Sequence, residues 1–310
     1  MKIMFMGTPE IAATCLKGLL DDGKEICAVV TREDKPRGRG NVMTPTPVKS
    51  LALEYGIPVY TPKTLRDGEF LSLLSDINPD LIAVVAYGKI LPPEVINYTR
   101  YGCINVHVSL LPKYRGAAPM QRAIMEGESE TGVTIMYMDE GLDTGDIICA
   151  ESFPITDEDD FETIHDRSAE VGARLLSKTV DDIENGAATR TAQDDALATY
   201  AKKVEKEDAK IDFNLDAKTV SQRIRGVTPI PGAFAYHGGK MLKIFRVSVS
   251  EGKGEPGEVL SVNGNGEGSI LVACKTGALL IKGVIPEGKG KMTAGDFVRG
   301  RKIDLGDILE

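Results

Sequence analysis

The distribution of apolar residues predicts alternating strands and helices over the first part of the chain. Residues 2–6 form an apolar run typical of a short buried strand, and Thr8 is the expected N-cap of the helix that follows. That helix carries apolar side chains at helical spacing, namely Ile11, Cys15, Leu16, Leu19 and Leu20. Residues 26–30 and 81–86 are further apolar runs, of the kind found in strands covered on both faces. The pattern predicts an α/β fold, with a Rossmann-like, mainly parallel sheet and helices on both faces.

A different pattern begins near residue 228, where short apolar segments are separated by frequent glycines. Short strands with turns at this spacing predict a small β-barrel. The stretch 237–240, His-Gly-Gly-Lys, is typical of a hairpin turn. A chain of 310 residues also has about the length at which a single core divides, so we expect two domains.

Composition narrows the class of protein. The chain is 42% hydrophobic and 27% charged, as in ordinary globular proteins, and its net charge of −9 argues mildly against a nucleic-acid partner. No apolar run approaches the ~20 residues of a membrane helix, and the N-terminal run ends too soon for a signal peptide. The five cysteines are scattered and fit reduced thiols better than a disulfide framework or a zinc site. We therefore expect a cytoplasmic protein, and a monomer.

The segment 31–49 is longer than the turns usual in such sheets, and we expect it to be a loop. It is rich in Gly and Pro and carries the basic residues Arg32, Lys35, Arg37 and Arg39. Such a loop is most often solvated surface, although Gly permits close backbone approach and Arg can bind phosphates or base edges. Near the N-terminus, Gly7 stands alone where a dinucleotide fingerprint needs Gly-x-Gly-x-x-Gly, so we do not expect NAD binding.

The most informative stretch is 103–119, which begins as a strand. Asn105, His107 and Ser109 are two residues apart and project from one face of that strand, at its carboxyl end, where open α/β sheets bind ligands. An imidazole can take up or return a proton, and a carboxamide can donate a hydrogen bond to a developing oxyanion. Together these groups suit acyl transfer. Two satisfied polar residues near a strand end would give the same pattern, and the residues alone do not decide between the two interpretations.

Two motifs supply a resemblance. Asn105-Val106-His107 with residues 109–116, Ser-Leu-Leu-Pro-Lys-Tyr-Arg-Gly, is similar to the signature of the folate-dependent formyltransferases. Residues 139–146, Asp-Glu-Gly-Leu-Asp-Thr-Gly-Asp, resemble the second active-site segment of that family. The acidic spacing in this segment does not fit a calcium loop, and we expect no metal. The resemblance implies 10-formyltetrahydrofolate as formyl donor and Asn105, His107 and Asp143 as the catalytic residues.

The resemblance also implies how these residues act. Asn105 and His107 would stabilise the oxyanion, His107 would move a proton toward the folate nitrogen, and Asp143 would orient the imidazole or a water. Which group first deprotonates the amine is left open. The implied folate site comprises Tyr87, Gly88, Lys89, Ile90, Leu91, Ser109, Leu110, Leu111, Pro112, Glu140 and Gly141. Without the family, residues 87–92 would be interpreted as a plain strand-to-helix loop.

Residues 34–40 and 47–49 resemble the insertion by which family members that act on initiator methionyl-tRNA bind its acceptor stem. This similarity implies Lys35, Arg37 and Arg39 as tRNA-binding residues, with Arg39 the main contact. Asn41 and Val42 depart from the pattern, because further lysines are expected there. The implied reaction is formylation of the α-amino group of methionyl-tRNA for translation initiation.

The same resemblance divides the chain. It implies a catalytic domain over residues 1–188, a linker over 189–208, and an OB-like, tRNA-binding β-barrel over 209–310. Three other functions remain open: formylation of a small amine such as glycinamide ribonucleotide or an amino sugar, hydrolysis of the formyl-folate, and RNA binding without catalysis. The basic insertion argues against the first, and the joint presence of Asn105, His107 and Asp143 argues against the last.

Overall fold

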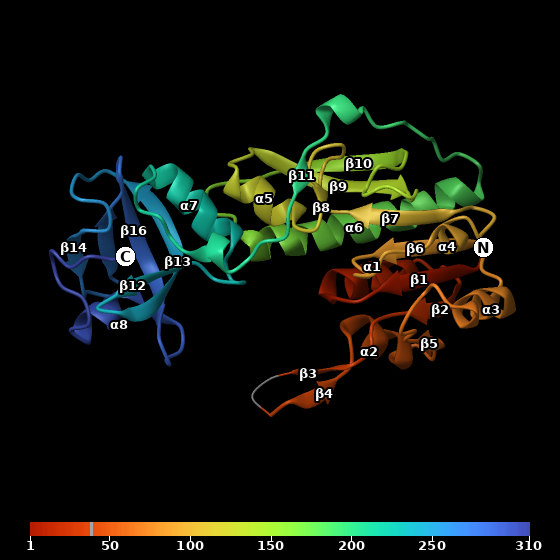
Figure 1. The fold of residues 1–310 in the computed structure, drawn as a ribbon, viewed down its shortest axis with the longest axis horizontal. Coiled ribbons are helices and arrows are strands. Elements are labelled where there is room, and N and C mark those ends of the chain that lie inside the picture. Colours follow the sequence, from red (N-terminus) through yellow and green to blue (C-terminus); the bar gives the residue numbers. More distant parts are fainter. Residues whose placement is uncertain (38–39) are drawn as a thin grey trace. The chain divides into compact units, whose positions relative to one another are not determined.

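The computed structural model describes residues 1–37 and 40–310 and divides into two compact units (Figure 1). Each unit collects several segments. The first comprises Met1–Gly116, Thr131–Phe153 and His165–Tyr200. The second comprises Ala117–Glu130, Pro154–Ile164 and Ala201–Glu310, so two segments that precede residue 165 belong to it.

A seven-stranded sheet forms the centre of the first unit, in the order β10-β9-β7-β6-β1-β2-β5. The strands are β1 (Ile3–Gly7), β2 (Ile26–Val30), β5 (Val59–Tyr60), β6 (Leu81–Val85), β7 (Cys103–His107), β9 (Glu130–Tyr137) and β10 (Ile147–Pro154). The five strands from β7 to β5 pair in parallel, whereas β9 runs antiparallel to β7. The predicted mainly parallel sheet is confirmed.

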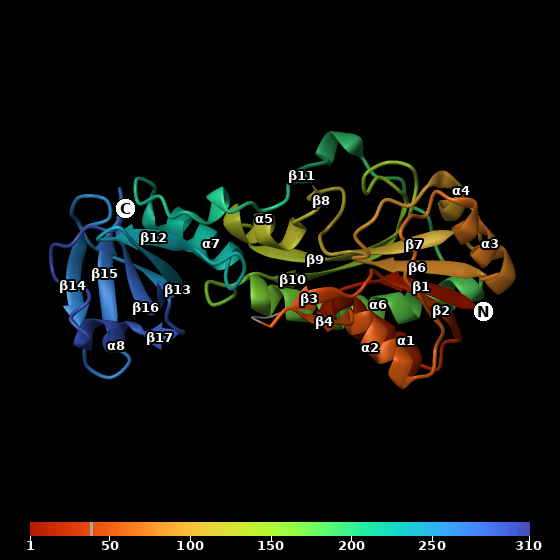
Figure 2. The same cartoon turned by 60° about the horizontal axis from the view of Figure 1, so that its bottom comes forward.

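Helices pack on both faces of this sheet (Figures 1 and 2). They are α1 (Glu10–Asp21), α2 (Pro47–Glu54), α3 (Gly68–Ile77), α4 (Pro93–Ile96) and α6 (Phe161–Glu184). Gly172 of α6 lies against Val106 of β7 and Cys15 of α1, so α1 and α6 cover one face. Cys103 of β7 belongs instead to a core cluster with buried residues of α3 and α4. These two helices therefore cover the opposite face.

The helix α1 begins one residue later than expected. Its N-cap is Pro9, which makes no side-chain capping bond, so the prediction that Thr8 caps this helix is wrong. The Thr8 hydroxyl instead donates to the backbone carbonyl of Tyr87 at 3.0 Å. A tertiary partner has replaced the local one, and the bond ties the β1–α1 turn to the segment after β6.

The segment 31–49 contains regular structure, so the prediction of a loop is wrong there. Strands β3 (Lys35–Arg37) and β4 (Val42–Thr44) pair as an antiparallel hairpin, visible in Figure 1. The helix α2 then begins at Pro47, and the Thr46 hydroxyl caps it by accepting from the Lys49 amide at 3.1 Å. Three-residue strands are too short to give a periodicity, whereas the Thr-Pro cap was a readable signal.

The second unit contains a six-stranded antiparallel sheet, in the order β12-β13-β16-β15-β14 with β17 on β16. Its strands are β12 (Phe234–His237), β13 (Lys240–Ser250), β14 (Val259–Asn263), β15 (Ser269–Ala273), β16 (Ala278–Pro286) and β17 (Met292–Thr293). Its helices are α5 (Pro119–Met125), α7 (Ala217–Gly226) and α8 (Ala294–Arg299). Gly226 of α7 packs tightly on Met125 of α5. The expected separate C-terminal β domain is confirmed.

Short elements occupy the connections. They are β8 (Arg115–Gly116), β11 (Tyr200–Ala201) and the 3₁₀ turns Asp195–Leu197 and Glu207–Ala209. Within the described residues, no helix is both long and apolar enough to cross a membrane.

Candidate active site

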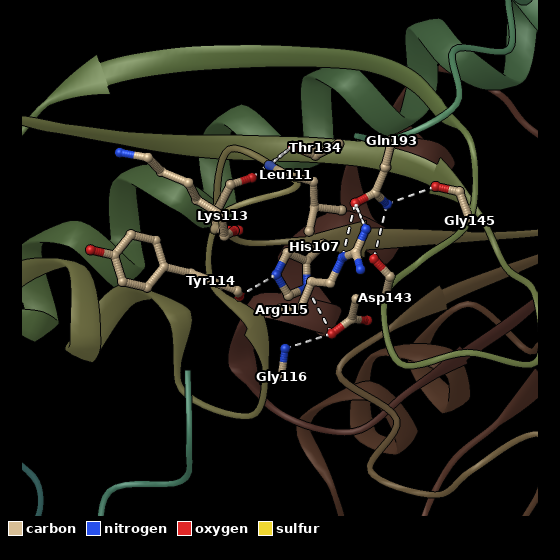
Figure 3. A network of polar contacts seen from close by, with 11 residues as sticks. His107, Leu111, Lys113, Tyr114, Arg115, Gly116, Thr134, Asp143, Gly145 and Gln193 are labelled. Atoms are coloured by element: carbon tan, nitrogen blue, oxygen red, sulfur yellow. Dashed lines mark hydrogen bonds and ion pairs between the residues drawn. The ribbon is translucent and has the colours of Figure 1, made fainter. Parts of the chain in front are cut away.

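The centre of the candidate site is His107, the last residue of β7. Its ring is 5% exposed, and Nε2 lies 3.0 Å from the backbone carbonyl oxygen of Tyr114 (Figure 3). A carbonyl oxygen can only accept, so Nε2 carries the proton of the neutral ring. The lone pair of the neutral imidazole is therefore on Nδ1.

Asp143 lies on that second side of the ring. Its Oδ2 is 3.7 Å from His107 Nδ1 and accepts a hydrogen bond from the Gly116 amide at 2.8 Å. The backbone of Asp143 has φ of +54°, a left-handed conformation that is uncommon for residues other than Gly. The carboxylate thus faces the nitrogen that can take up a proton.

Burial lowers the pKa of His107, because removal from water disfavours the charged imidazolium. The Asp143 carboxylate acts in the opposite direction, and so does the Tyr114 carbonyl, but burial is the larger effect. The imidazole is therefore neutral at pH 7 and available as a base. Once protonated, it would be stabilised by Asp143.

Asp143 reaches His107 by an indirect route. Strand β9 is antiparallel to β7, with Tyr137 opposite Ile104, so the 139–146 loop starts near the end of β7 remote from His107. The short Asp143–His107 distance requires this loop to fold back along β7. Its approach is on the α3–α4 face, because His107 projects from β7 on the same side as Cys103.

Asn105 precedes His107 by two residues on β7 and projects from the same face. It is half-buried, and its carboxamide makes no hydrogen bond to any other residue that the structure describes. Its two N–H donors therefore have no competing protein acceptor there. They can serve a bound carbonyl group.

The predicted folate segment after β7 is held by internal hydrogen bonds. The Ser109 hydroxyl donates to the Lys113 carbonyl at 2.7 Å, and Thr134 Oγ1 donates to the Ser109 carbonyl at 2.7 Å. Thr134 Oγ1 also accepts from the Leu111 amide at 3.2 Å, and the Leu111–Pro112 peptide is cis. Ser109 and Leu111 are buried, whereas Leu110 and Pro112 are half-buried, so the latter two are the side chains of this segment that a ligand could reach.

The predicted folate segment after β6 has both buried and exposed side chains. Tyr87 and Leu91 lie in the core under α3 and α4, and burial raises the pKa of Tyr87 to about 12. Lys89 donates from Nζ to the carbonyls of Pro62 at 2.6 Å and Lys63 at 2.8 Å. Gly88 has φ of +80°, and Ile90 is 82% exposed. Gly88 and Ile90 are thus the members of this segment that a ligand could reach.

The remaining predicted folate residues, Glu140 and Gly141, are exposed in the 139–146 loop. The Gly141 amide donates to Asp139 Oδ1 at 3.0 Å, and so does the Thr144 hydroxyl at 2.6 Å. A Cβ at Gly141 would come within 1.9 Å of Thr144 Oγ1. Only Gly fits this turn as it stands, so the geometry of the turn is enough to explain why residue 141 is Gly.

Of the three predicted tRNA-binding residues, Lys35 is exposed at the start of β3. Arg37 ends the same strand, and Arg39 lies outside the described residues. No group of three or more His, Cys, Asp or Glu side chains suited to a metal ion occurs in the described part of the chain.

Two residues not predicted as site residues join the network. Arg115 is 2% exposed and donates through Nε and Nη2 to Gln193 Oε1, at 3.1 and 2.8 Å. Nη2 also donates to Asp195 Oδ1 at 2.8 Å. Gln193 Nε2 donates to the backbone carbonyls of Asp143 at 2.9 Å and Gly145 at 2.8 Å. No local sequence pattern links the two residues, because Arg115 and Gln193 are 78 positions apart.

A mainly parallel sheet with a buried imidazole facing a carboxylate at a strand end defines an α/β protein equipped for proton transfer. Comparison with known proteins specifies the family. The model of the formyl transferase family matches residues 1–180, and the model of the formyl transferase C-terminal domain matches residues 203–302. The chain therefore belongs to the formyl transferase family, as its two motifs predicted.

Relatives in this family match the whole chain. The methionyl-tRNA formyltransferases of Citrifermentans bemidjiense and Geotalea uraniireducens are each 47% identical over 309 residues, covering 100% of this chain and 96% and 98% of theirs.

Solved structures share the fold. A sugar 3N-formyltransferase, WlaRD, has a TM-score of 0.67 at 20% identity, covering 94% of this chain and 99% of its own. HypX from Aquifex aeolicus, in complex with tetrahydrofolic acid, has a TM-score of 0.67 at 21% identity, covering 99% of this chain and 50% of its own.

Proposed function

We propose that this protein transfers the formyl group of 10-formyltetrahydrofolate to the α-amino group of initiator methionyl-tRNA, in the cytoplasm and as a monomer. The observation that carries the proposal is the 47% identity, over the entire chain, to proteins named methionyl-tRNA formyltransferase. The sugar formyltransferase shares the fold at 20% identity, and that level of likeness does not extend to the acceptor. Formylation of a small amine is therefore the less supported alternative.

In the proposed reaction, the amine nitrogen bonds to the formyl carbon, the bond from that carbon to the folate nitrogen breaks, and one proton passes from the amine to the folate nitrogen. His107 Nδ1 is placed to carry this proton, because Nε2 is committed to the Tyr114 carbonyl. Asp143, 3.7 Å away, stabilises the imidazolium while the proton is on the ring. The ring is neutral again once the proton is returned, so no further acid is required.

Asn105 has a separate task in this proposal. Negative charge develops on the formyl oxygen as the amine attacks, and a donor directed at that oxygen lowers the barrier. The Asn105 carboxamide is suited to this because it lies on the same face of β7 as His107 and has no acceptor among the described residues. Residues 109–112, Gly88 with Ile90, and the 140–141 turn would hold the folate.

The proposal is tested by supplying purified protein with 10-formyltetrahydrofolate and charged initiator or elongator tRNA. Formylation of initiator methionyl-tRNA, well above that of the elongator, is the expected result. Faster formylation of glycinamide ribonucleotide or an amino sugar would establish the alternative, and formate release without any acceptor would indicate a hydrolase. Light scattering of the purified protein tests the monomer.

The hairpin β3–β4 supplies a prediction about the tRNA. We propose that Lys35, Arg37 and Arg39 contact its acceptor stem, with Arg39 making the main contact through its fork of donors. Arg39→Ala is expected to raise the KM for tRNA about tenfold while the KM for folate is unchanged. Arg174→Ala is the matched control, since Arg174 is an exposed arginine paired with Glu151. Equal loss of affinity for both substrates in Arg39→Ala would contradict the assignment.

A further inference from the structure

Gln193 contacts neither the imidazole nor the carboxylate of the site, but it holds the chain that carries the carboxylate. Its Nε2 donates to the backbone carbonyls of Asp143 and Gly145, at 2.9 and 2.8 Å (Figure 3). These two carbonyls bracket the turn in which Asp143 adopts its left-handed backbone. The side chain of Gln193 thus fixes the main chain at the point where the 139–146 loop approaches His107.

The orientation of the Gln193 amide is determined by its neighbours. Arg115 presents only donors to it, at 3.1 and 2.8 Å, and the two carbonyls present only acceptors. A flipped amide would set its NH₂ against the guanidinium and its oxygen against the carbonyls, so all four hydrogen bonds would be lost. Arg115 is buried and bonds to Asp195 as well, which keeps its own fork in place.

The turn needs such a constraint. A left-handed backbone is unfavourable at a residue other than Gly and is retained only where surrounding contacts enforce it. The carboxylate of Asp143 contributes the Gly116 amide bond and the contact with His107. At the far side of the turn, Gly145 is packed so closely on β9 that a Cβ would lie 1.8 Å from the Tyr137 carbonyl oxygen. The two bonds from Gln193 fall between these anchors.

We propose that Gln193, itself held by Arg115, is a positioning residue for catalysis: its amide fixes the 143–145 turn so that the Asp143 carboxylate stays opposite His107. The inference rests on the proposed function, because it assigns Gln193 a role through Asp143. It also gives the connector between residues 189 and 200 a part in the active site. Displacement of a catalytic group by about 1 Å can cost on the order of 10²-fold in rate.

Gln193→Glu is the discriminating variant. It keeps the shape and the acceptor for Arg115 but replaces the two donors with oxygen lone pairs, which repel the carbonyls of Asp143 and Gly145. We expect kcat to fall between about 10- and 100-fold, with both KM values within about threefold of wild type. Gln121→Glu is the matched control, because Gln121 also donates to a backbone carbonyl, that of Ile230 at 3.0 Å, away from the site.

A purely structural role would lower stability without changing the electrostatics at His107. Asp143 is the ionised group that faces this imidazole among the described residues, and it raises the pKa of His107. Gln193→Met removes both donors without adding a charge, so displacement of the Asp143 carboxylate should lower the pKa of His107 in this variant, as followed by NMR titration. The chain has only three histidines, so the resonances can be assigned by substitution. Because Met has a similar volume, Gln193→Met also supplies the kcat measurement if Gln193→Glu does not fold.

A double-mutant cycle completes the test. If Gln193 acts through Asp143, then adding Gln193→Glu to Asp143→Asn should lower kcat no further than Asp143→Asn alone. A multiplicative loss, an unchanged kcat in Gln193→Glu, or an unchanged pKa of His107 in Gln193→Met would overturn the inference. These outcomes leave the proposed function intact, which fails instead if the wild-type protein does not formylate methionyl-tRNA.

Discussion

Replacing His107 with Ala is expected to lower kcat for formyl transfer about 10³-fold, with little change in either KM. Positioned general acid–base groups contribute about 10²- to 10⁴-fold, and His107 is the only imidazole near Asp143 in the described chain. In the proposed mechanism the ring carries the proton in the chemical step, so kcat rather than either KM should change. Steady-state kinetics with charged tRNA and 10-formyltetrahydrofolate measures the effect.

His165→Ala is the matched control, since His165 is a partly exposed imidazole on α6 beside Asp166. It should retain the kcat of the wild type. Loss of activity in His107→Ala, without loss of secondary structure, would then report the missing ring. A kcat within about threefold of wild type would show that His107 is not the proton carrier.

The pH dependence of wild-type activity follows from the burial of His107. The pKa of His107 is lowered from its ordinary value near 6.5, so the neutral, reactive form persists below that pH. Activity should fall only as pH drops through the lowered value. In the folded state the ring also binds protons less readily than in the unfolded state, so this group's contribution to stability declines as pH falls through the same window.

Local sequence patterns predicted the site residues that lie together on one strand or helix. Asn105 and His107 share a face of β7 because strand side chains alternate, and that alternation is visible in the sequence. The sheet strands β2 and β6 were likewise predictable, because buried parallel strands are continuous apolar runs. What such patterns cannot provide is the partner on another element.

Asp143 is the clearest example. The rule that ligands gather at the carboxyl ends of parallel strands does not place it, since β9 is antiparallel to β7 and directs its loop to the other end. The family resemblance identified Asp143 as a site residue. Its carboxylate comes close to His107 only because the 139–146 loop folds back along β7. Gln193 had neither kind of signal, and Arg115, although it lies within the first motif, was given no role by the resemblance. Their burial is a tertiary property, and an Arg in a motif or a Gln in a connector is usually exposed.

The role of the carboxylate leads to the second large effect. Asp143→Asn keeps the shape of the side chain and an oxygen that can accept from the Gly116 amide, but it removes the charge that faces His107 Nδ1 at 3.7 Å. Two unit charges at about 4 Å and an effective dielectric of about 20 interact by roughly 4 kcal/mol. If about two thirds of this stabilisation is expressed when the proton is on the ring, kcat should fall on the order of 10²-fold.

The pH profile separates this electrostatic effect from simple misplacement. Asp143 raises the pKa of His107 against the larger effect of burial, so removing its charge should lower that pKa further. The acid limb of the kcat/KM profile should then move to lower pH, although the maximal rate is smaller. Asp166→Asn, beside the partly exposed His165, should change neither the rate nor the limb. An acid limb that moves to higher pH, or a kcat close to that of the wild type, would mean that the carboxylate does not stabilise the imidazolium, and the proton would have to be carried by another group.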